Sequence, residues 1–308
     1  MTPEAGRLAP VLENLGESTV ALGREHEKRL GHLSELAEEV VRALAPTDMR
    51  TLLAALPQAL EEALPTYLAG EDTPTAHAAT LRGALASLAG YDAAELTLLL
   101  RRAAERRLGA PLTLSDLAEG TKPPPARSRV VYVSNPLSDA AVPALTASLG
   151  APRVAQRQTL RELFDDVDNG YADYAILPMS SDGVPIPSVT TLLDTYEMKL
   201  AAIHTVPTEE GGVVFGLLCR LAVELFPPRY LLLRLLPERE GELAAILAAA
   251  GRLSCRIPYL APTPLTYDRG RFAYRLVAAG DADGLASLAL YLALFAKGHT
   301  VCGCYDAV

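Results

Sequence analysis

Small hydroxyl and amide side chains follow three apolar stretches in the middle of the sequence. Ser134 and Asn135 come directly after RVVYV, and Ser180 and Ser181 come after ADYAILPM. Thr208 follows a third such stretch, KLAAIHTVP. Ligands of open α/β sheets bind at the carboxyl ends of the strands. These five residues could therefore bind a carboxylate or a hydroxyl group of a small molecule.

Proton-transfer chemistry needs more than these residue types supply. None of the five side chains is an evident proton donor of suitable pKa. Ser180 and Ser181 are therefore weak candidates for catalysis, whereas Ser134, Asn135, Ser181 and Thr208 are candidates for substrate binding. A second interpretation is equally consistent with the sequence: Ser134 and Asn135 cap the helix that follows, and Ser180 and Ser181 form a turn.

The spacing of apolar residues predicts which elements position these side chains. Residues 1–120 are almost wholly helical in pattern and predict a helical bundle. The proline-rich segment 121–128 predicts a stiff linker, since three successive prolines cannot continue a helix. Strands and helices alternate over residues 129–226, which predicts an α/β lobe with a mainly parallel sheet. Residues 227–308 follow the order β-α-β-β-α-β, which predicts a ferredoxin-like domain.

Composition excludes several classes of protein. The chain has 308 residues, half of them hydrophobic, and a formal net charge of -9, which disfavours a nucleic-acid binder. No uncharged apolar run reaches the length of a membrane span, and the first residues lack a secretory pattern. The four cysteines and five histidines do not show metal-ligand or nucleophile–base spacing, so we expect a cytoplasmic protein without metal or cofactor.

The order of the three regions, with motifs in the last two, resembles the prephenate dehydratase family, in the layout fused to a chorismate mutase. The run from TLRELF to KLAAIHTV is similar to the first lobe of that family, and the last domain resembles its ACT domain. The tail matches are Gly241 and Leu243 in REGELAAIL, and Gly303 and Tyr305 in HTVCGCYDA. The matching residues of the lobe are Gly170, Ala172, Asp173, Tyr174, Pro178, Gly183, Leu192 and Leu193.

The chain departs from the family at the residues that carry its chemistry. The family's Glu-Asn-Ser triplet is Met179-Ser180-Ser181 here, so only the serine matches. Its Thr-Arg-Phe motif has no counterpart before the tail, and its Glu-Ser-Arg-Pro effector motif matches at Pro264 only. The second lobe of the dehydratase is also missing, because residues 208–228 can form one returning strand and a turn but no lobe.

The resemblance implies a place in phenylalanine metabolism, and the departures imply a protein that binds or regulates rather than catalyses. It implies an aromatic amino acid or a prephenate-like carboxylate as ligand, Gly241, Glu242 and Leu243 as effector-binding residues, and a homodimer formed through the ACT-like domain. Two alternatives stay open. One is an active prephenate dehydratase or chorismate mutase, with a site completed by the helical region or a dimer partner. The other is a protein-interaction scaffold that binds no small molecule.

The mutase alternative depends on cations in the helical region. All-helical chorismate mutases bind a dianionic substrate with arginines and lysines inside the bundle, and the candidates in this sequence are Arg24, Lys28, Arg101, Arg102 and Arg106. These residues are mixed with acidic ones, as on a solvated helix face. The pattern therefore favours a structural or dimerising bundle over a working mutase.

Overall fold

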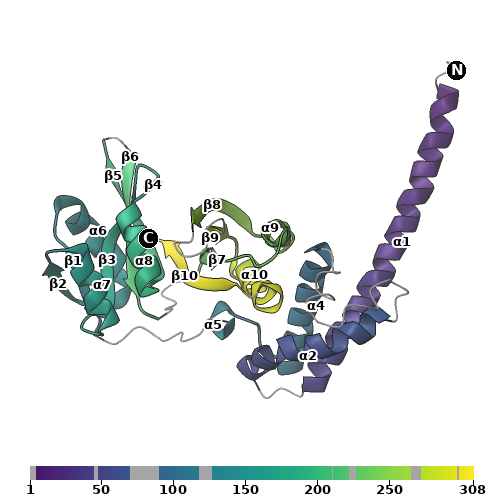
Figure 1. The fold of residues 1–308 in the computed structure, drawn as a ribbon, viewed down its shortest axis with the longest axis horizontal. Coiled ribbons are helices and arrows are strands. Elements are labelled where there is room, and N and C mark those ends of the chain that lie inside the picture. The colour runs from purple at the N-terminus through teal and green to yellow at the C-terminus, as the bar shows by residue number, and fades with distance from the viewer. Residues whose placement is uncertain are drawn as a thin grey trace. The chain divides into compact units, whose positions relative to one another are not determined.

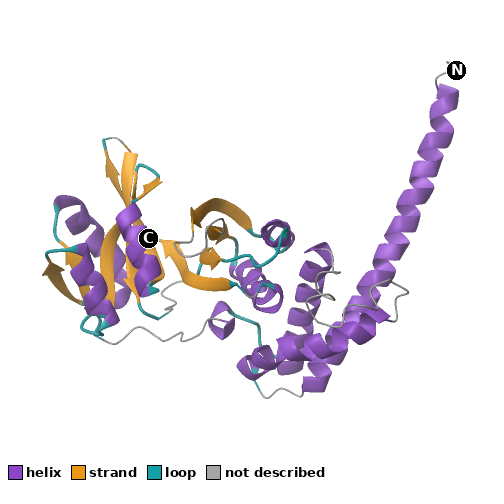
Figure 2. Cartoon of the chain, viewed as in Figure 1, coloured by secondary structure: helices purple, strands orange, loops and turns teal. Residues whose placement is uncertain are grey.

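A computed structural model describes residues 5–44, 48–69, 90–117, 127–209, 211–221, 227–264, 272–296 and 298–308. The chain forms two compact units, residues 1–111 and 112–308. The first is helical, as the uniform purple of α1, α2 and α4 in Figure 2 shows, and the second is mixed α/β. The predicted linker, 121–128, lies almost entirely outside the described residues.

The helical unit is built from α1 (Ala5–Leu44), α2 (Met49–Ala69) and α4 (Gly90–Leu108). Helix α1 contacts both of the others, and apolar side chains fill the space between them. Leu33, Leu52 and Leu100, one from each helix, are at most 1% exposed. An ion pair also joins two of the helices, because the buried carboxylate of Asp92 in α4 lies 2.8 Å from the guanidinium of the exposed Arg29 in α1. Leu33 of α1 thus faces the interior of this unit.

The α/β unit contains one continuous sheet, labelled in Figure 1, which has ten strands in the described residues. The strand order is β2-β1-β3-β6-β5-β10-β7-β9-β8, with β4 paired to β3. The strands of the first half are β1 (Arg129–Val133), β2 (Arg153–Arg157), β3 (Tyr174–Ser181), β4 (Val184–Pro185), β5 (Lys199–Thr208) and β6 (Gly211–Cys219). Those of the second half are β7 (Tyr230–Leu235), β8 (Arg256–Pro264), β9 (Phe272–Ala279) and β10 (His299–Ala307).

Helices cover both faces of the first half of the sheet. Helix α6 (Pro136–Thr146) lies on one face, where its Leu145 packs in a cluster with Phe215 and Tyr174. Helices α7 (Leu160–Asp168) and α8 (Pro187–Tyr196) lie on the other, where Phe164 and Val189 share a cluster with Leu177. This is the three-layer arrangement that the alternating pattern predicts.

The second half of the sheet has the predicted β-α-β-β-α-β order. Its helices are α9 (Glu242–Arg252) and α10 (Ala282–Phe295), and the short helix α5 (Leu114–Leu117) contacts α10. Strands β10, β7, β9 and β8 lie side by side in that order and are all antiparallel to their neighbours. Strand β8 is the free edge of the sheet, and it contains Pro258, Pro262 and Pro264.

Three features of the sheet differ from the sequence prediction. The sheet of the lobe is not mainly parallel, because β6 runs antiparallel between β3 and β5 and β4 pairs antiparallel with β3. The segment RVAQR forms strand β2 at the other edge of the sheet, although no strand is predicted there. The lobe and the tail, predicted as separate domains, share the sheet because β5 pairs in parallel with β10. At this junction Gly303 packs so closely that a Cβ atom would lie 2.4 Å from the carbonyl oxygen of Leu200.

Tyr174 in the core of the sheet leads to a stability prediction. Its ring is 1% exposed, and its hydroxyl has no hydrogen-bond partner within the described residues. Because an unsatisfied buried hydroxyl is destabilising, we expect Tyr174→Phe to raise the free energy of unfolding by about 1 kcal/mol. Tyr132→Phe is the matched control, since the Tyr132 hydroxyl accepts a hydrogen bond from Gln156 at 3.1 Å. Urea unfolding should show a gain for the first substitution and none for the second.

The same tyrosine predicts how stability changes at high pH. Burial raises the pKa of Tyr174 above its ordinary value of 10.0, and the nearby Cys219 and Asp173 raise this pKa further. The unfolded chain therefore loses this proton at lower pH than the folded chain does, so stability should fall as the pH rises above about 10. Tyr174→Phe should make that fall shallower, and an unchanged pH profile would contradict the assignment.

Candidate functional site

The sequence-predicted site residues lie along one edge of the sheet. Strands β1 and β3 are parallel, and β6 is antiparallel to both β3 and β5, so β1, β3 and β5 all point the same way. The carboxyl ends of these three strands therefore lie together along one border of the sheet. This border, called the sheet edge, runs across the strand ends and is distinct from the edge strands β2 and β8. In Figure 1 the ends of β5 and β6 project from this edge beside β4. The five candidate residues divide between two places on it.

Ser134 and Asn135 lie at the end of β1 and serve the helix that follows. The side-chain oxygen of Asn135 accepts hydrogen bonds from the backbone N–H groups of Leu137 at 3.1 Å and Ser138 at 3.0 Å, which makes Asn135 the N-cap of α6. The Ser134 hydroxyl donates to the carboxylate of Asp139 at 3.1 Å. Asn135 therefore has the capping role that one of the two interpretations of the sequence predicts.

Ser180 and Ser181 lie within strand β3 rather than in a turn after it. Ser181 pairs with Val184 of β4 on one side and with Val213 of β6 on the other. The turn follows at Asp182 and Gly183, whose φ angles are 52° and 80°. The prediction of a turn at the serines is therefore wrong by about two residues, because the short strand β4 extends the pairing of β3.

Asp182 is the acid nearest to Ser181 in sequence, and its carboxylate braces the hairpin. One carboxylate oxygen accepts a hydrogen bond from the Ser181 hydroxyl at 3.1 Å, and the other accepts a hydrogen bond from the backbone N–H of Gly212 at 3.1 Å. Asp182 is exposed, so water contacts it as well. A general acid for dehydration has to be held next to the leaving oxygen in a site that excludes water. An exposed carboxylate that closes a turn does not meet that requirement.

Thr208 ends β5 and faces Gly211 across the β5–β6 hairpin. Strand β6 lies between Thr208 and Ser181, because Ser181 pairs with Val213 of β6. Ser181 and Thr208 thus share one three-stranded ribbon formed by β3, β6 and β5. Ser134 continues β1 beyond Tyr132, which pairs with Ile176, and so lies level with Pro178. That is three residues before Ser181, a separation of about 10 Å along the strand direction.

The residues that carry the resemblance have structural roles. Asp173 joins the start of β3 to the start of β1: its carboxylate accepts the backbone N–H of Arg129 at 2.8 Å and pairs with the Arg129 guanidinium at 3.1 Å. Burial alone would raise the pKa of Asp173, but the hydrogen bonds and the charge of Arg129 outweigh burial and lower this pKa. Gly170 and Gly183 have φ angles of 73° and 80°, which side chains other than glycine rarely adopt. Asp173, Gly170 and Gly183 thus stabilise the strand ends and turns of the fold.

The predicted effector residues lie at the start of α9. Gly241 is the N-cap, with φ 79°, and no side chain caps this helix end. The Glu242 carboxylate turns back on the preceding loop and accepts the backbone N–H groups of Glu238 at 2.9 Å and Arg239 at 3.1 Å. Leu243 is half-buried in the next position. The loop before α9 is thus fixed by its own hydrogen bonds.

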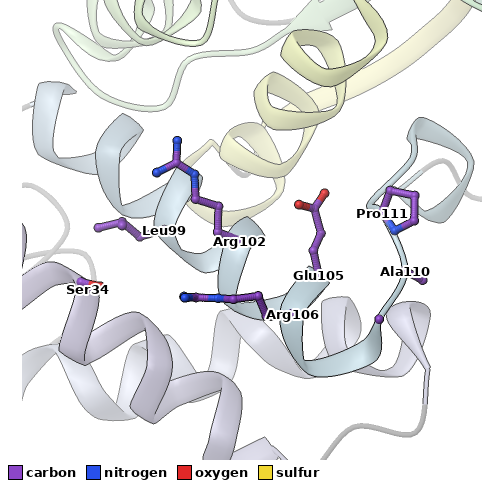
Figure 3. A pocket seen from close by; sticks show the side chains of 8 residues that line it. Ser34, Leu99, Arg102, Glu105, Arg106, Ala110 and Pro111 are labelled. Atoms are coloured by element: carbon purple, nitrogen blue, oxygen red, sulfur yellow. The ribbon is translucent and has the colours of Figure 1, made fainter.

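A pocket of about 600 Å³ lies in the helical unit, at the last turn of α4. Figure 3 shows Arg102, Glu105 and Arg106 of α4 along it, with Arg106 directed toward α1, where Ser34 lies. Arg106 forms an ion pair with Glu38 of α1, and Glu105 forms one with Arg101 at 2.8 Å. The charges that line the pocket are thus largely compensated within the unit.

Of the five cations considered for a mutase, only Arg102 and Arg106 line this pocket. Arg101 is buried in its pair with Glu105, while Arg102 and Arg106 are exposed at the pocket wall. Arg24 and Lys28 are exposed on α1 and do not line the pocket. Arg24 precedes the pocket residue Ser34 by ten positions, about 15 Å along a helix. The structure therefore brings together only part of this set.

Cysteine and histidine side chains are used in packing and in backbone contacts. The four cysteines are free thiols, two of them buried. The rings of His204 and His299 bond to backbone oxygens, those of Val308 and Ala296. In the parts of the chain that the structure describes, no group of three His, Cys, Asp or Glu residues could hold a metal ion. Within the same parts, none of the helices combines the length and apolar character that a bilayer crossing requires.

Comparisons with known proteins find similar folds but no related sequence. No protein-family model matches the chain, and no curated protein matches it. A prephenate dehydratase structure from Streptococcus mutans has a TM-score of 0.48 and 18% identity, over 58% of this chain and 98% of that chain. A protein described as a novel type of quorum quenching acylase, GqqA, has a TM-score of 0.47 and 20% identity, over 58% of this chain and 95% of that chain.

A third similar structure is described with a ligand. It is a prephenate dehydratase from Arthrobacter aurescens in complex with L-Phe, with a TM-score of 0.45 and 11% identity, over 58% of this chain and 90% of that chain. At such low identities, activity has to be argued from the residues of this molecule.

Proposed function

We propose that the chain is a catalytically degenerate relative of prephenate dehydratase, which acts in phenylalanine metabolism by binding a ligand or by regulation. The observation that carries this proposal is the hairpin of β5 and β6. After β5 the chain returns at once as β6 between β5 and β3, and β7 begins at Tyr230. Residues 209–229 join β5 to β7 and include the nine residues of β6, so too little chain is left for a second wall around a substrate.

The side chains at the sheet edge support the same proposal. Ser134 and Asn135 are engaged in capping α6, and Ser181 bonds to the exposed acid that closes its own hairpin. Binding of prephenate would need fixed donors for two carboxylates, and its dehydration would need a sheltered acid. The residues at this edge provide hydroxyl groups but no such acid.

The proposed ligand is an aromatic amino acid or a prephenate-like carboxylate, bound at the start of α9 by the segment from Gly241 to Leu243. Support comes from the resemblance of REGELAAIL to the effector motif and from the pre-formed loop that Glu242 fixes. The ferredoxin-like strand order supports an ACT-like domain, and we propose that it mediates a homodimer. Free cysteines support a reducing compartment, so cytoplasmic location is part of the proposal.

One experiment tests catalysis. Purified full-length protein is incubated with prephenate, and phenylpyruvate is followed by absorbance; we expect no formation above the uncatalysed rate. Turnover that Ser181→Ala abolishes would contradict the proposal, because it would place a working site at the sheet edge. Turnover that survives Ser181→Ala but is lost in Arg102→Gln would instead support the alternative of a site completed by the helical unit.

A second experiment tests ligand binding. Thermal unfolding is measured with L-phenylalanine, L-tyrosine and prephenate, and we expect at least one to stabilise the protein. A ligand at ten times its Kd adds about 1.4 kcal/mol. Leu243→Ala should remove this effect, whereas Leu247→Ala, the same change at a half-buried position one turn later in α9, should keep it. The absence of stabilisation by every ligand at millimolar concentration would favour a scaffold without a small-molecule ligand.

A further inference from the structure

The pocket at the last turn of α4 has two polar side chains that are available to a ligand. Arg102 of α4 lines the pocket and is exposed, and within the described residues its guanidinium forms no ion pair and no hydrogen bond. Ser34 of α1 also lines the pocket, and its hydroxyl has no hydrogen-bond partner in the same part of the chain. The pocket wall thus offers a planar fork of N–H donors and a hydroxyl donor.

The other charged side chains of the pocket wall are paired. Arg106 forms an ion pair with Glu38 of α1, and Glu105 forms one with the buried Arg101 at 2.8 Å. Because the charges of each pair cancel, Arg102 leaves the wall with an excess of one positive charge. The end of α4 adds the negative end of the helix dipole, which is equivalent to about half a charge and does not cancel this excess. The wall therefore suits a ligand with one negative charge, rather than the dianion that a mutase binds.

Helical spacing places an apolar side chain and the second arginine next to Arg102. Residues three and four positions apart on a helix have Cβ atoms about 5–6 Å apart, so Leu99 and Arg106 are both neighbours of Arg102 on one face of α4. Like charges at this spacing repel each other. In Figure 3 the Arg106 side chain extends from α4 toward Ser34. An anion next to Arg102 therefore has donors from two helices within one pocket and an apolar side chain beside it.

We propose that this pocket binds a monocarboxylate that is attached to an apolar group. The guanidinium fork of Arg102 matches the geometry of a carboxylate, and the hydroxyl of Ser34 donates a further hydrogen bond. Arg106 has five N–H donors, so it can keep its ion pair and still donate to the ligand. Leu99 and Pro111 provide apolar contacts. The volume of about 600 Å³ is in the range usual for small-molecule pockets.

An amine of the same size has no comparable site in this pocket. Glu105 is the one carboxylate among the residues that line the pocket, and it is already engaged by Arg101. An ammonium group would also be repelled by the guanidinium of Arg102. The sign of the ligand's charge is therefore a sharp test of the proposal.

Binding is tested by calorimetric titration of the full chain with phenylacetate, acetate and benzylamine. We expect phenylacetate to bind more tightly than either of the others, because it alone combines a carboxylate with an apolar ring. Arg102→Gln should weaken this binding about tenfold, the usual cost of losing a hydrogen bond to a charged group. Arg107→Gln is the matched control, because Arg107 is exposed on the same helix but does not line the pocket. No binding of phenylacetate, equal binding of benzylamine, or equal loss in the two variants would overturn the proposal.

The salt dependence of binding provides an independent readout. Salt screens the attraction between an exposed guanidinium and a carboxylate, so the affinity for phenylacetate should fall as salt is added, and should fall less in Arg102→Gln. An affinity that does not change with salt would overturn the proposal. Ser34→Ala should weaken binding by a smaller factor than Arg102→Gln. These outcomes are separable from the function proposed above, since a response to L-phenylalanine that depends on Leu243 should be intact in Arg102→Gln.

Discussion

Gly303→Ala is expected to lower the free energy of unfolding by about 3 kcal/mol, the upper end of the usual cost of overpacking. A Cβ atom at this position would lie 2.4 Å from the oxygen and 2.8 Å from the nitrogen of Leu200, and backbone atoms cannot rotate away as a flexible side chain can. Gly303 is paired with Leu200 in the junction of β10 and β5, where the two halves of the sheet meet. The substitution should therefore weaken the junction in particular.

The control for this prediction is Gly251→Ala in α9. A Cβ atom there has nothing within 4 Å, and alanine favours a helix over glycine, so stability should be unchanged or slightly higher. Urea unfolding gives the two energies. Hydrogen exchange at the Val308 amide, which bonds to Ile203 at 2.9 Å across the same junction, reports whether the strands separate locally. Equal energies for the two variants would show that the strands do not pack as closely as described.

Phe215→Ala is expected to cost about 3–5 kcal/mol, as is usual for a buried phenylalanine. Phe215 lies on β6 and is 1% exposed, packed with Tyr174 and Leu145 in the core under α6. In the family that the sequence resembles, a second lobe would begin at the place in the chain where β6 lies. A cost of this size would show that β6 is an integral part of the core of the single lobe.

Tyr171→Ala is the matched control, since this aromatic side chain is 69% exposed. Its removal should change the free energy of unfolding by no more than about 0.5 kcal/mol. Chemical denaturation of both variants, with equal m-values as a check on two-state behaviour, makes the comparison. Similar small costs at the two positions would contradict the placement of β6 in the core.

Strand β2 shows the limit of the sequence patterns for the fold. Most elements were predictable because each has an apolar face with the period of a helix or a strand. The segment Arg153–Arg157 has no such face, since Arg153 to Gln156 are all exposed at the edge of the sheet. Its strand conformation comes from pairing with β1, a tertiary contact. The β5–β10 junction was unpredictable for the same reason, because no local pattern specifies which distant strands pair.

The candidate site was predictable in its position but not in its details. Parallel strands place Ser134, Ser181 and Thr208 at one edge, as the order of elements indicates. Whether a hydroxyl is available to a ligand depends on neighbours such as Asp139 and Asp182, whose bonds the sequence cannot specify.

The prolines of β8 have a consequence for how the sheet can grow. A proline in a sheet sits where its missing N–H would point away from the neighbouring strand. Pro262 and Pro264 share that outward alternation with Leu260, so two of these three positions offer no amide to an incoming strand. The opposite tail strand, β10, is already occupied by β5. Strand addition to the tail by another molecule of this protein is therefore hindered at β8, because two of the outward positions lack an N–H group.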